Sequence, residues 1–368
     1  MMRLNEREWK VFSLTGENGL FPIHATSTGV DSIKLKDGDD TTLPYITRTE
    51  MNNGISKFIS AKNMAYGKDE GGCITIGLDT QTAYWQPTSF VTGQNIHVLR
   101  SGKLNFFSYQ FIAVILRQQM KSKFNWGGNG ATLGRLKKLK IMLPVTGEGK
   151  PDYKFMEDYI RELMDRKYKQ YQDYAQKQMA ALEAGRYVNL GVDLLTICKW
   201  SAFAISDIFD IKPGKRLVAA ETTKGRRPFI GALDNNNGVA RFVSDKNSSL
   251  DKNVLGVNYN GNGMVIGFYH PYECIFSDDV KRFHLKHYED NQFVLLFMKA
   301  CILMQKQKFG YLYKFNAERM AHTSIMLPTT KDGVPDYAFM EIYAKLMVLQ
   351  KYKQYLLFTK EVKKTWTV

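Results

Sequence analysis

Residues 80 to 147 carry nine lysine or arginine side chains and no aspartate or glutamate. Such a segment suits contact with a polyanion, because lysine and arginine neutralise phosphates. Aromatic and amide side chains accompany these charges and can approach nucleic-acid bases. An ordinary solvated basic face would equally explain any single lysine. The candidate DNA-binding residues, with one arginine that precedes the segment, are Arg48, Lys121, Lys123, Trp126, Asn129, Arg135, Lys137 and Lys138.

The C-terminal half of the chain offers a second set of cations and aromatic side chains. Arginine can bind guanine bidentately, and asparagine can bind adenine in the same way. The run Asn235 to Gly238 also fits base reading, although turn formation explains an Asn-Asn-Gly sequence better. The candidate DNA-binding residues of this half are Lys215, Arg216, Arg226, Arg227, Tyr311, Lys314 and Arg319.

Signals for catalysis are weak, and no catalytic or metal-binding residue is predicted. An amino-methyltransferase needs an Asn/Asp-Pro-Pro-aromatic loop, but the chain has no Pro-Pro dipeptide, and it also lacks a P-loop. The run Glu361 to Lys363 superficially resembles part of a nuclease site, yet it falls on a predicted helix. His284 and His287 lie three residues apart without an evident third ligand, so a metal site is not expected.

Composition places the chain among globular proteins with an anionic partner. Its 368 residues are 44% hydrophobic, which is enough to bury a sizeable core, and its formal net charge is +15. Four cysteines without a CxxC pair, and no secretory signal, favour a reducing cytoplasm. The longest apolar run covers residues 293 to 304 and is interrupted by Lys299, so it is too short to cross a bilayer.

The chain repeats itself at a constant offset of 184 residues. Residues 141–171 and 325–355 are identical at 18 of 31 positions without a gap. The first copy holds seven extra residues near its start, so the chain is a tandem duplication of residues 1–187 and 188–368.

Each copy is predicted to have the same α+β organisation. Short strand-like runs and Gly/Asn turns are followed by an apolar helix, at 106–120 and 292–305, and then by a long polar helix that begins at a Pro-Asp pair. The predicted parts are a globular domain at 1–150, a long helix at 151–187, a second domain at 188–334 and a second long helix at 335–368.

Semi-apolar residues spaced by three and four form a stripe along each long helix. We expect the two helices to pack on each other as an antiparallel coiled coil, because such a stripe is unstable in water. Packing of each helix on its own domain is the alternative, and a partner protein could also cover part of the stripe. The predicted seam residues are Met156, Ile160, Leu163, Tyr171, Met340, Met347 and Tyr355.

The duplicated arrangement resembles the DNA specificity subunits of type I restriction-modification systems. The opening of that family's target recognition domain is similar to Trp200-Ser201 followed by Pro213-Gly214-Lys215-Arg216. The strand before the family's long helix is similar to residues Ile325 to Pro328. The Pro-Asp-Tyr-x-Phe-Met-Glu motifs at 151 and 335 are similar to the type IIB branch. The first copy departs from the family, since Thr28 to Asp31 stands where the Pro-Gly-Lys-Arg turn is expected.

The resemblance implies a noncatalytic subunit that binds double-stranded DNA. Two target recognition domains would each read one half of a bipartite sequence, while the paired helices set the spacing and dock methyltransferase and nuclease subunits. S-adenosylmethionine, Mg²⁺ and ATP would be used by those partners and not bound by this chain. The alternatives are a stand-alone nuclease and a protein-binding anti-restriction or scaffold protein. The positive net charge argues against a DNA mimic.

Overall fold

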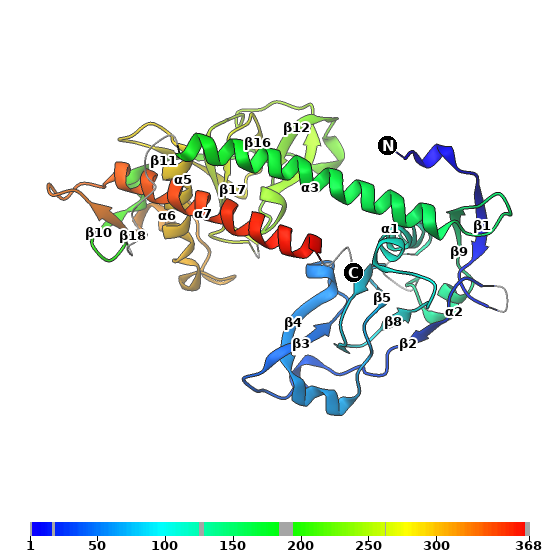
Figure 1. Ribbon diagram of the computed structural model, residues 1–368. Helices are drawn as coiled ribbons and strands as arrows, with labels where there is room; N and C mark the ends of the chain where they lie inside the picture. The colour runs from blue at the N-terminus through cyan, green and yellow to red at the C-terminus, as the bar shows by residue number, and fades with distance from the viewer. Residues whose placement is uncertain (1, 17–18, 125–128, 184–193, 262, 365–368) are drawn as a thin grey trace. The chain divides into compact units, whose positions relative to one another are not determined.

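The structure is a computed structural model that describes residues 2–16, 19–124, 129–183, 194–261 and 263–364. The chain forms two compact units, Met1–Tyr171 and Gln172–Val368. Figure 1 shows that each unit mixes short strands with helices. Trp126 and the predicted boundary at 187/188 lie outside the described residues.

The described residues of the first unit form three small sheets. Its four-stranded sheet has the order β2-β8-β5-β6, its three-stranded sheet has the order β4-β3-β7, and β1 pairs antiparallel with β9. The strands are β1 (Trp9–Ser13), β2 (Ile23–Ala25), β3 (Thr41–Ile46), β4 (Ile55–Ser60), β5 (Cys73–Gly77), β6 (Ala83–Gln86), β7 (Val91–Thr92), β8 (Ile96–Leu99) and β9 (Lys140–Pro144).

The second unit repeats this topology sheet by sheet. The corresponding orders are β11-β17-β14-β15 and β13-β12-β16, and β10 pairs antiparallel with β18. This match supports the duplication inferred from the sequence. The strands are β10 (Lys199–Ala204), β11 (Phe209–Pro213), β12 (Lys224–Ile230), β13 (Val239–Val243), β14 (Val254–Asn258), β15 (Gly267–His270), β16 (Ile275–Phe276), β17 (Val280–Leu285) and β18 (Ser324–Thr329).

The helices α1, α2 and α3 of the first copy correspond in order to α5, α6 and α7 of the second, and the short α4 between β10 and β11 has no α-helical counterpart among the described residues of the first copy. The Pro-Asp signal marks the start of each long helix, because Asp152 and Asp336 each accept a 2.9 Å hydrogen bond from the backbone N–H three residues later. The helices are α1 (Phe106–Lys123), α2 (Leu133–Lys137) and α3 (Tyr153–Glu183), then α4 (Ile205–Ile208), α5 (Gln292–Leu303), α6 (Ala317–His322) and α7 (Tyr337–Lys364).

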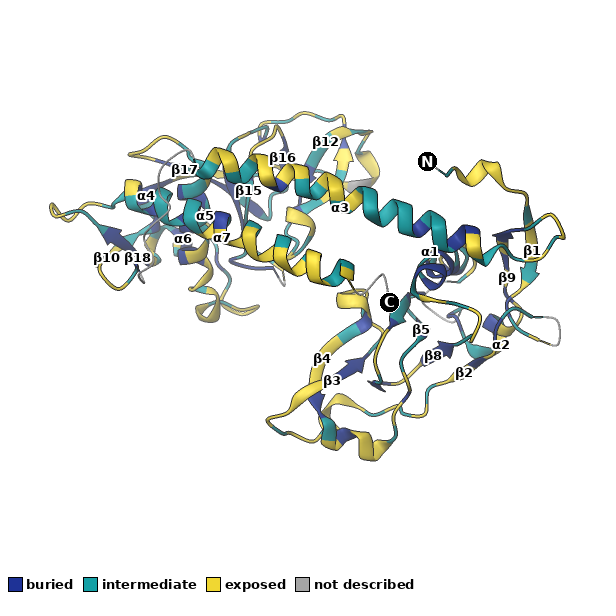
Figure 2. Ribbon diagram, viewed as in Figure 1, coloured by how far each residue is buried: buried dark blue, intermediate teal, exposed yellow. Residues whose placement is uncertain are grey.

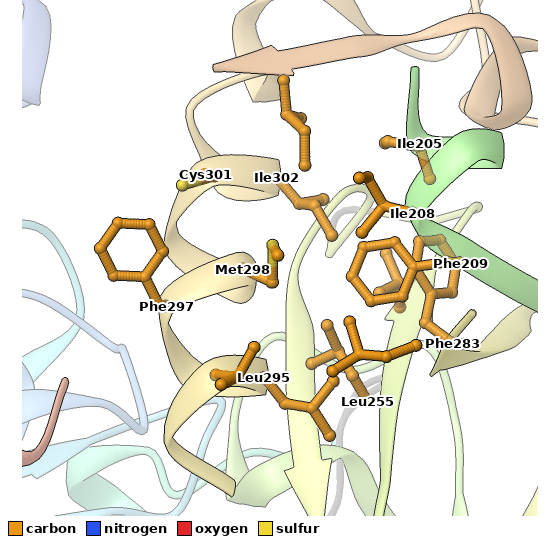
Figure 3. Close-up of a cluster of buried hydrophobic side chains, with 14 of the residues drawn as sticks. Ile205, Ile208, Phe209, Leu255, Phe283, Leu295, Phe297, Met298, Cys301 and Ile302 are labelled. Atoms are coloured by element: carbon orange, nitrogen blue, oxygen red, sulfur yellow. The ribbon is translucent and has the colours of Figure 1, made fainter. Parts of the chain in front are cut away.

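The apolar helix α5 forms the core of the second unit, as Figure 3 shows. Leu295 and Met298 are fully buried and belong to the same cluster as Phe283 of β17. The first turns of α7 join this cluster through Met340 and Ala344, which are 0% and 6% exposed. The start of the long helix therefore packs on its own domain, which was the alternative to helix pairing. Met156 and Ile160 of α3 are buried as well.

Further along, α7 contacts residues 172–183, the part of α3 that belongs to the second unit. The rings of Tyr174 and Tyr352 lie 6.2 Å apart with their hydroxyls at 3.3 Å, and Lys353 forms a 2.8 Å ion pair with Glu183. Figure 1 shows that these two segments run in opposite directions. The antiparallel pairing of the long helices is therefore present in the second unit.

The α7 residues that contact α3 in this pairing, Tyr352 and Lys353, lie outside the predicted stripe. Met347 and Tyr355 are 37% and 49% exposed, whereas Leu349 is buried and Tyr352 makes the contact. Met347 lies five residues before Tyr352, which places it roughly 140° around the helix from the contact. Leu163 and Tyr171 of α3 are half-buried. The exposed pair remains a prediction as partner-binding residues.

Candidate nucleic-acid interface

A group of exposed cations in the first unit lies at the ends of α1 and α2. Lys121 and Lys123 are exposed in the last turn of α1, and the Nδ2 group of Asn129 donates a 3.0 Å hydrogen bond to the carbonyl of Lys123. Lys137 and Lys138, at the end of α2, are also exposed. These four lysines are therefore available to a polyanion.

Arg135 and Arg319 instead hold the chain that precedes their own helices. Arg135 donates a 2.9 Å hydrogen bond to the carbonyl of Gly130, and Arg319 does the same to the carbonyl of Lys314 at 2.9 Å. The guanidinium of Arg319 also lies 3.8 Å from the centre of the Tyr313 ring. Since both copies make the same bond, these arginines are structural clamps as well as candidate DNA contacts.

Replacing Arg319 with lysine is expected to lower the free energy of unfolding by about 1 to 2 kcal/mol, because lysine keeps the charge but loses the planar stack on Tyr313. Urea denaturation of the full chain measures the change, and Lys308→Ala, at an exposed position, is the control. Unchanged stability together with weaker DNA binding would show that Arg319 contacts DNA directly and is not a clamp.

The other arginines differ in how much charge they present to solvent. Arg48 forms an ion pair with Asp79. Arg226 is exposed, but the side chain of its neighbour Arg227 is 15% exposed and bonds to Glu273 at 2.7 Å and to two backbone carbonyls. Because its donors are already engaged, Arg227 is a weaker candidate for base reading than Arg226.

Lys215 and Arg216 are exposed on a fixed turn after β11. A Cβ at Gly214 would lie 1.9 Å from the carbonyl oxygen of Ser277, so only glycine fits there. The backbone N–H of Lys215 donates a 2.9 Å hydrogen bond to the carbonyl of Phe276. The turn therefore presents two solvated cations from a rigid base.

The chain between α5 and α6 presents exposed aromatic residues beside cations. Tyr311 is 85% exposed, and the Nζ atom of Lys314 lies 5.6 Å from its ring centre. Tyr313 stacks on Phe309 with ring centres 5.8 Å apart. Tyr311, Lys314 and Arg319 are thus brought together, as expected for a surface that contacts both phosphates and bases.

A charged network in the second unit was not anticipated from the sequence. His284 Nδ1 lies 2.6 Å from a carboxylate oxygen of Asp290, and its Nε2 lies 3.0 Å from Asp251. Arg282 completes the network with a 2.8 Å bond to Asp251. The hydrogen bond to Asp290, opposed by burial and supported by Asp251, raises the pKa of His284 above its ordinary value. Asp290 lies 6 residues from His284 in sequence and Asp251 lies 33 residues from it, so no local sequence pattern reveals this network.

Stability of the second unit should consequently fall as the pH rises above about 6.5, the usual histidine pKa. A histidine whose pKa is raised on folding stabilises the protein below the unfolded value and loses that contribution as the pH passes through the folded value. Urea denaturation from pH 6 to 9 measures the loss, which His284→Gln should reduce. Equal pH dependence in the variant and the natural chain would contradict this assignment.

Nothing in the described ranges assembles three or more His, Cys, Asp or Glu side chains for a metal ion. No helix in the described part of the chain is both long and apolar enough to cross a membrane. Glu361, of the superficial nuclease motif, bonds to Lys364 at 2.7 Å on the last turns of α7. The exposed groups that the candidate surfaces offer are therefore cations and aromatic rings.

Two copies of one small domain, each followed by a long helix and each bearing exposed cations, define a duplicated nucleic-acid-binding subunit. A family model for the type I restriction modification DNA specificity domain matches residues 6–171 and 198–355. The chain belongs to this family and is a DNA specificity subunit of a restriction-modification system.

The comparisons also identify individual relatives. The chain is 40% identical over 320 residues to the type II restriction enzyme BgcI specificity subunit S.BcgI of Heyndrickxia coagulans, covering 86% of this chain and 89% of that one. Among solved structures, the type I S subunit from M. genitalium matches at 12% identity, with a TM-score of 0.47 and coverage of 99% and 96%. The HsdS subunit from Thermoanaerobacter tengcongensis matches at 12% identity, with a TM-score of 0.32 and coverage of 96% and 91%.

Proposed function

We propose that each domain of this specificity subunit binds one half of a split DNA sequence, and that α3 and α7 set the distance between the halves. The observation behind this proposal is that the two units share their sheet orders but differ in the cations that they expose. The second unit has the Lys215-Arg216 turn, and the first has Thr28 to Asp31 in the corresponding place. A common scaffold with different exposed residues suits two different half-sites.

The chain then acts in the cytoplasm with enzymatic subunits that supply the chemistry. These partners are a DNA methyltransferase, which uses S-adenosylmethionine, and a nuclease that uses Mg²⁺, with ATP where translocation is involved. The relative S.BcgI is named as the specificity subunit of a type II restriction enzyme, which favours the same kind of system for this chain. The chain itself performs no catalysis and binds no cofactor.

Equilibrium binding of the full chain to duplex DNA tests this function. Affinity should fall steeply with salt, with a slope of about −0.9 in log K against log [salt] for each phosphate neutralised. A DNA complex that does not respond to salt, or no complex at all, would contradict the proposal. Cleavage or methylation by the purified chain alone, with Mg²⁺ or S-adenosylmethionine, would instead favour the stand-alone enzyme.

A further inference from the structure

A tight turn between α5 and α6 holds two large side chains in solvent. Gly310 and Tyr313 close this turn with two backbone hydrogen bonds, of 3.1 and 3.0 Å, so Tyr311 and Leu312 form its tip. Their side chains are 85% and 95% exposed. Figure 2 shows that much of the chain between α5 and α6 is exposed. We call residues 310–313 the α5–α6 turn.

The base of the α5–α6 turn is fixed to the core of the second unit. The ring of Tyr313 stacks on that of Phe309, with centres 5.8 Å apart and planes 8° apart, and the guanidinium of Arg319 lies 3.8 Å from its centre. Phe309 in turn packs at 4.6 Å on Phe315, which is 0% exposed. The two side chains at the tip therefore stand on an ordered base, and they are the first that a binding partner would meet.

The segment that carries the α5–α6 turn is positively charged. Residues 291–317 contain four lysines and no aspartate or glutamate. Lys306 and Lys308 are exposed on the chain that leads to the turn, and Lys314 follows it, with its Nζ atom 5.6 Å from the Tyr311 ring centre. Cations on both sides of an apolar tip complement duplex DNA, in which apolar stacked bases lie between two strands of phosphates.

The side chain of Leu312 distinguishes between the ways in which the tip could bind. The core of a protein interface is depleted in lysine, whereas lysines stand on both sides of this turn. Leucine has no donor or acceptor with which to hydrogen-bond the edge of a base. It is, however, one of the apolar side chains that DNA-binding proteins insert between neighbouring base pairs.

We propose that Leu312 inserts between two neighbouring base pairs of the half-site that the second domain binds, while Lys306 and Lys308 contact the phosphates beside it. This inference rests on the proposed function, in which the second domain binds DNA. Insertion from the minor groove unstacks one base step and kinks the duplex by about 20° or more. The corresponding segment of the first copy includes residues 125–128, outside the described ranges, so the inference concerns the second domain alone.

Bending and unstacking of a bound duplex test the insertion. The full chain, without enzymatic subunits, is bound to a duplex that carries the sequence selected by the assembled system. Energy transfer between dyes at the two duplex ends measures the bend, and 2-aminopurine at successive positions reports an unstacked base by its brighter fluorescence. The natural chain should bend the duplex by about 20° or more and brighten the probe at one step of the second half-site.

Leu312→Ser should abolish both signals, because serine is too small and polar to fill the space between two base pairs. Leu312→Met should keep both, since methionine is also an inserting side chain. Ile33→Ser is the matched control and should leave both signals unchanged. Ile33 is 89% exposed, but Asp31 and Asp37 flank it in the sequence. Thermal unfolding of each variant shows whether these exposed substitutions leave the fold intact.

An unbent duplex on the natural chain, a bend that persists in Leu312→Ser, or an equal loss in Ile33→Ser would overturn the proposal. Loss of an enzymatic subunit from the assembled system in Leu312→Ser, with the DNA bend intact, would assign the α5–α6 turn to a protein interface instead. Failure of the proposed function is distinguishable, because the natural chain would then not bind the duplex at all.

Discussion

Lengthening both long helices by 22 residues is expected to widen the gap between the two DNA half-sites by about ten base pairs. The insertions would follow Tyr171 and Tyr355, which are equivalent positions of the two copies. Twenty-two helical residues add about 33 Å, close to one turn of the duplex, and they rotate the helix by only roughly 40° beyond whole turns. Both domains would thus meet the same face of the DNA one turn further apart.

Methylome sequencing of cells that carry the variant system measures this change. The half-sites should stay the same, and methylation of the original sequence should be lost. An insertion of 11 residues in each helix is the matched control, because about 16 Å corresponds to half a duplex turn and directs the second domain to the opposite face. Methylation at the original gap in both variants would show that the helices do not set the spacing.

Replacement of Arg216 with alanine is expected to cost about 1 to 3 kcal/mol of binding free energy at one position of the second half-site, if this arginine reads a base. Lys121→Ala should weaken binding to all sequences about equally and reduce the salt slope by about 0.9, because a phosphate contact has no sequence preference. Competition binding against duplexes with single base changes separates the two effects.

Arg227→Ala is the control for this comparison, since its guanidinium already bonds to Glu273 and to backbone carbonyls. It should leave the sequence preference unchanged. If Arg216→Ala and Lys121→Ala lost affinity uniformly over all sequences, the assignment of Arg216 to base reading would be wrong.

The amino-acid sequence predicted the architecture well because its strongest signals are local or repeated. The constant offset of 184 residues predicted two copies, and the structure shows the same sheet orders in both. The Asp152 and Asp336 caps and the Asn-Asn-Gly turns were also predicted, because each depends on a few neighbouring residues.

The partners of individual side chains could not be predicted. The sequence placed Arg135 and Arg227 among the candidate DNA-binding cations, but a backbone carbonyl engages the first and Glu273, 46 residues away, engages the second. Hydrophobic spacing on α7 favoured Met347, whereas the contact with Tyr174 of α3 uses the hydroxyl and ring of Tyr352, a residue outside the predicted stripe.

Selection from a random duplex library by the full chain with its enzymatic partner tests the central claim most directly. Sequencing of the bound DNA should yield two short specific blocks separated by a gap of fixed length and unspecified sequence. One continuous block, or two blocks at variable separation, would contradict the account of two domains that read separate half-sites at a fixed distance.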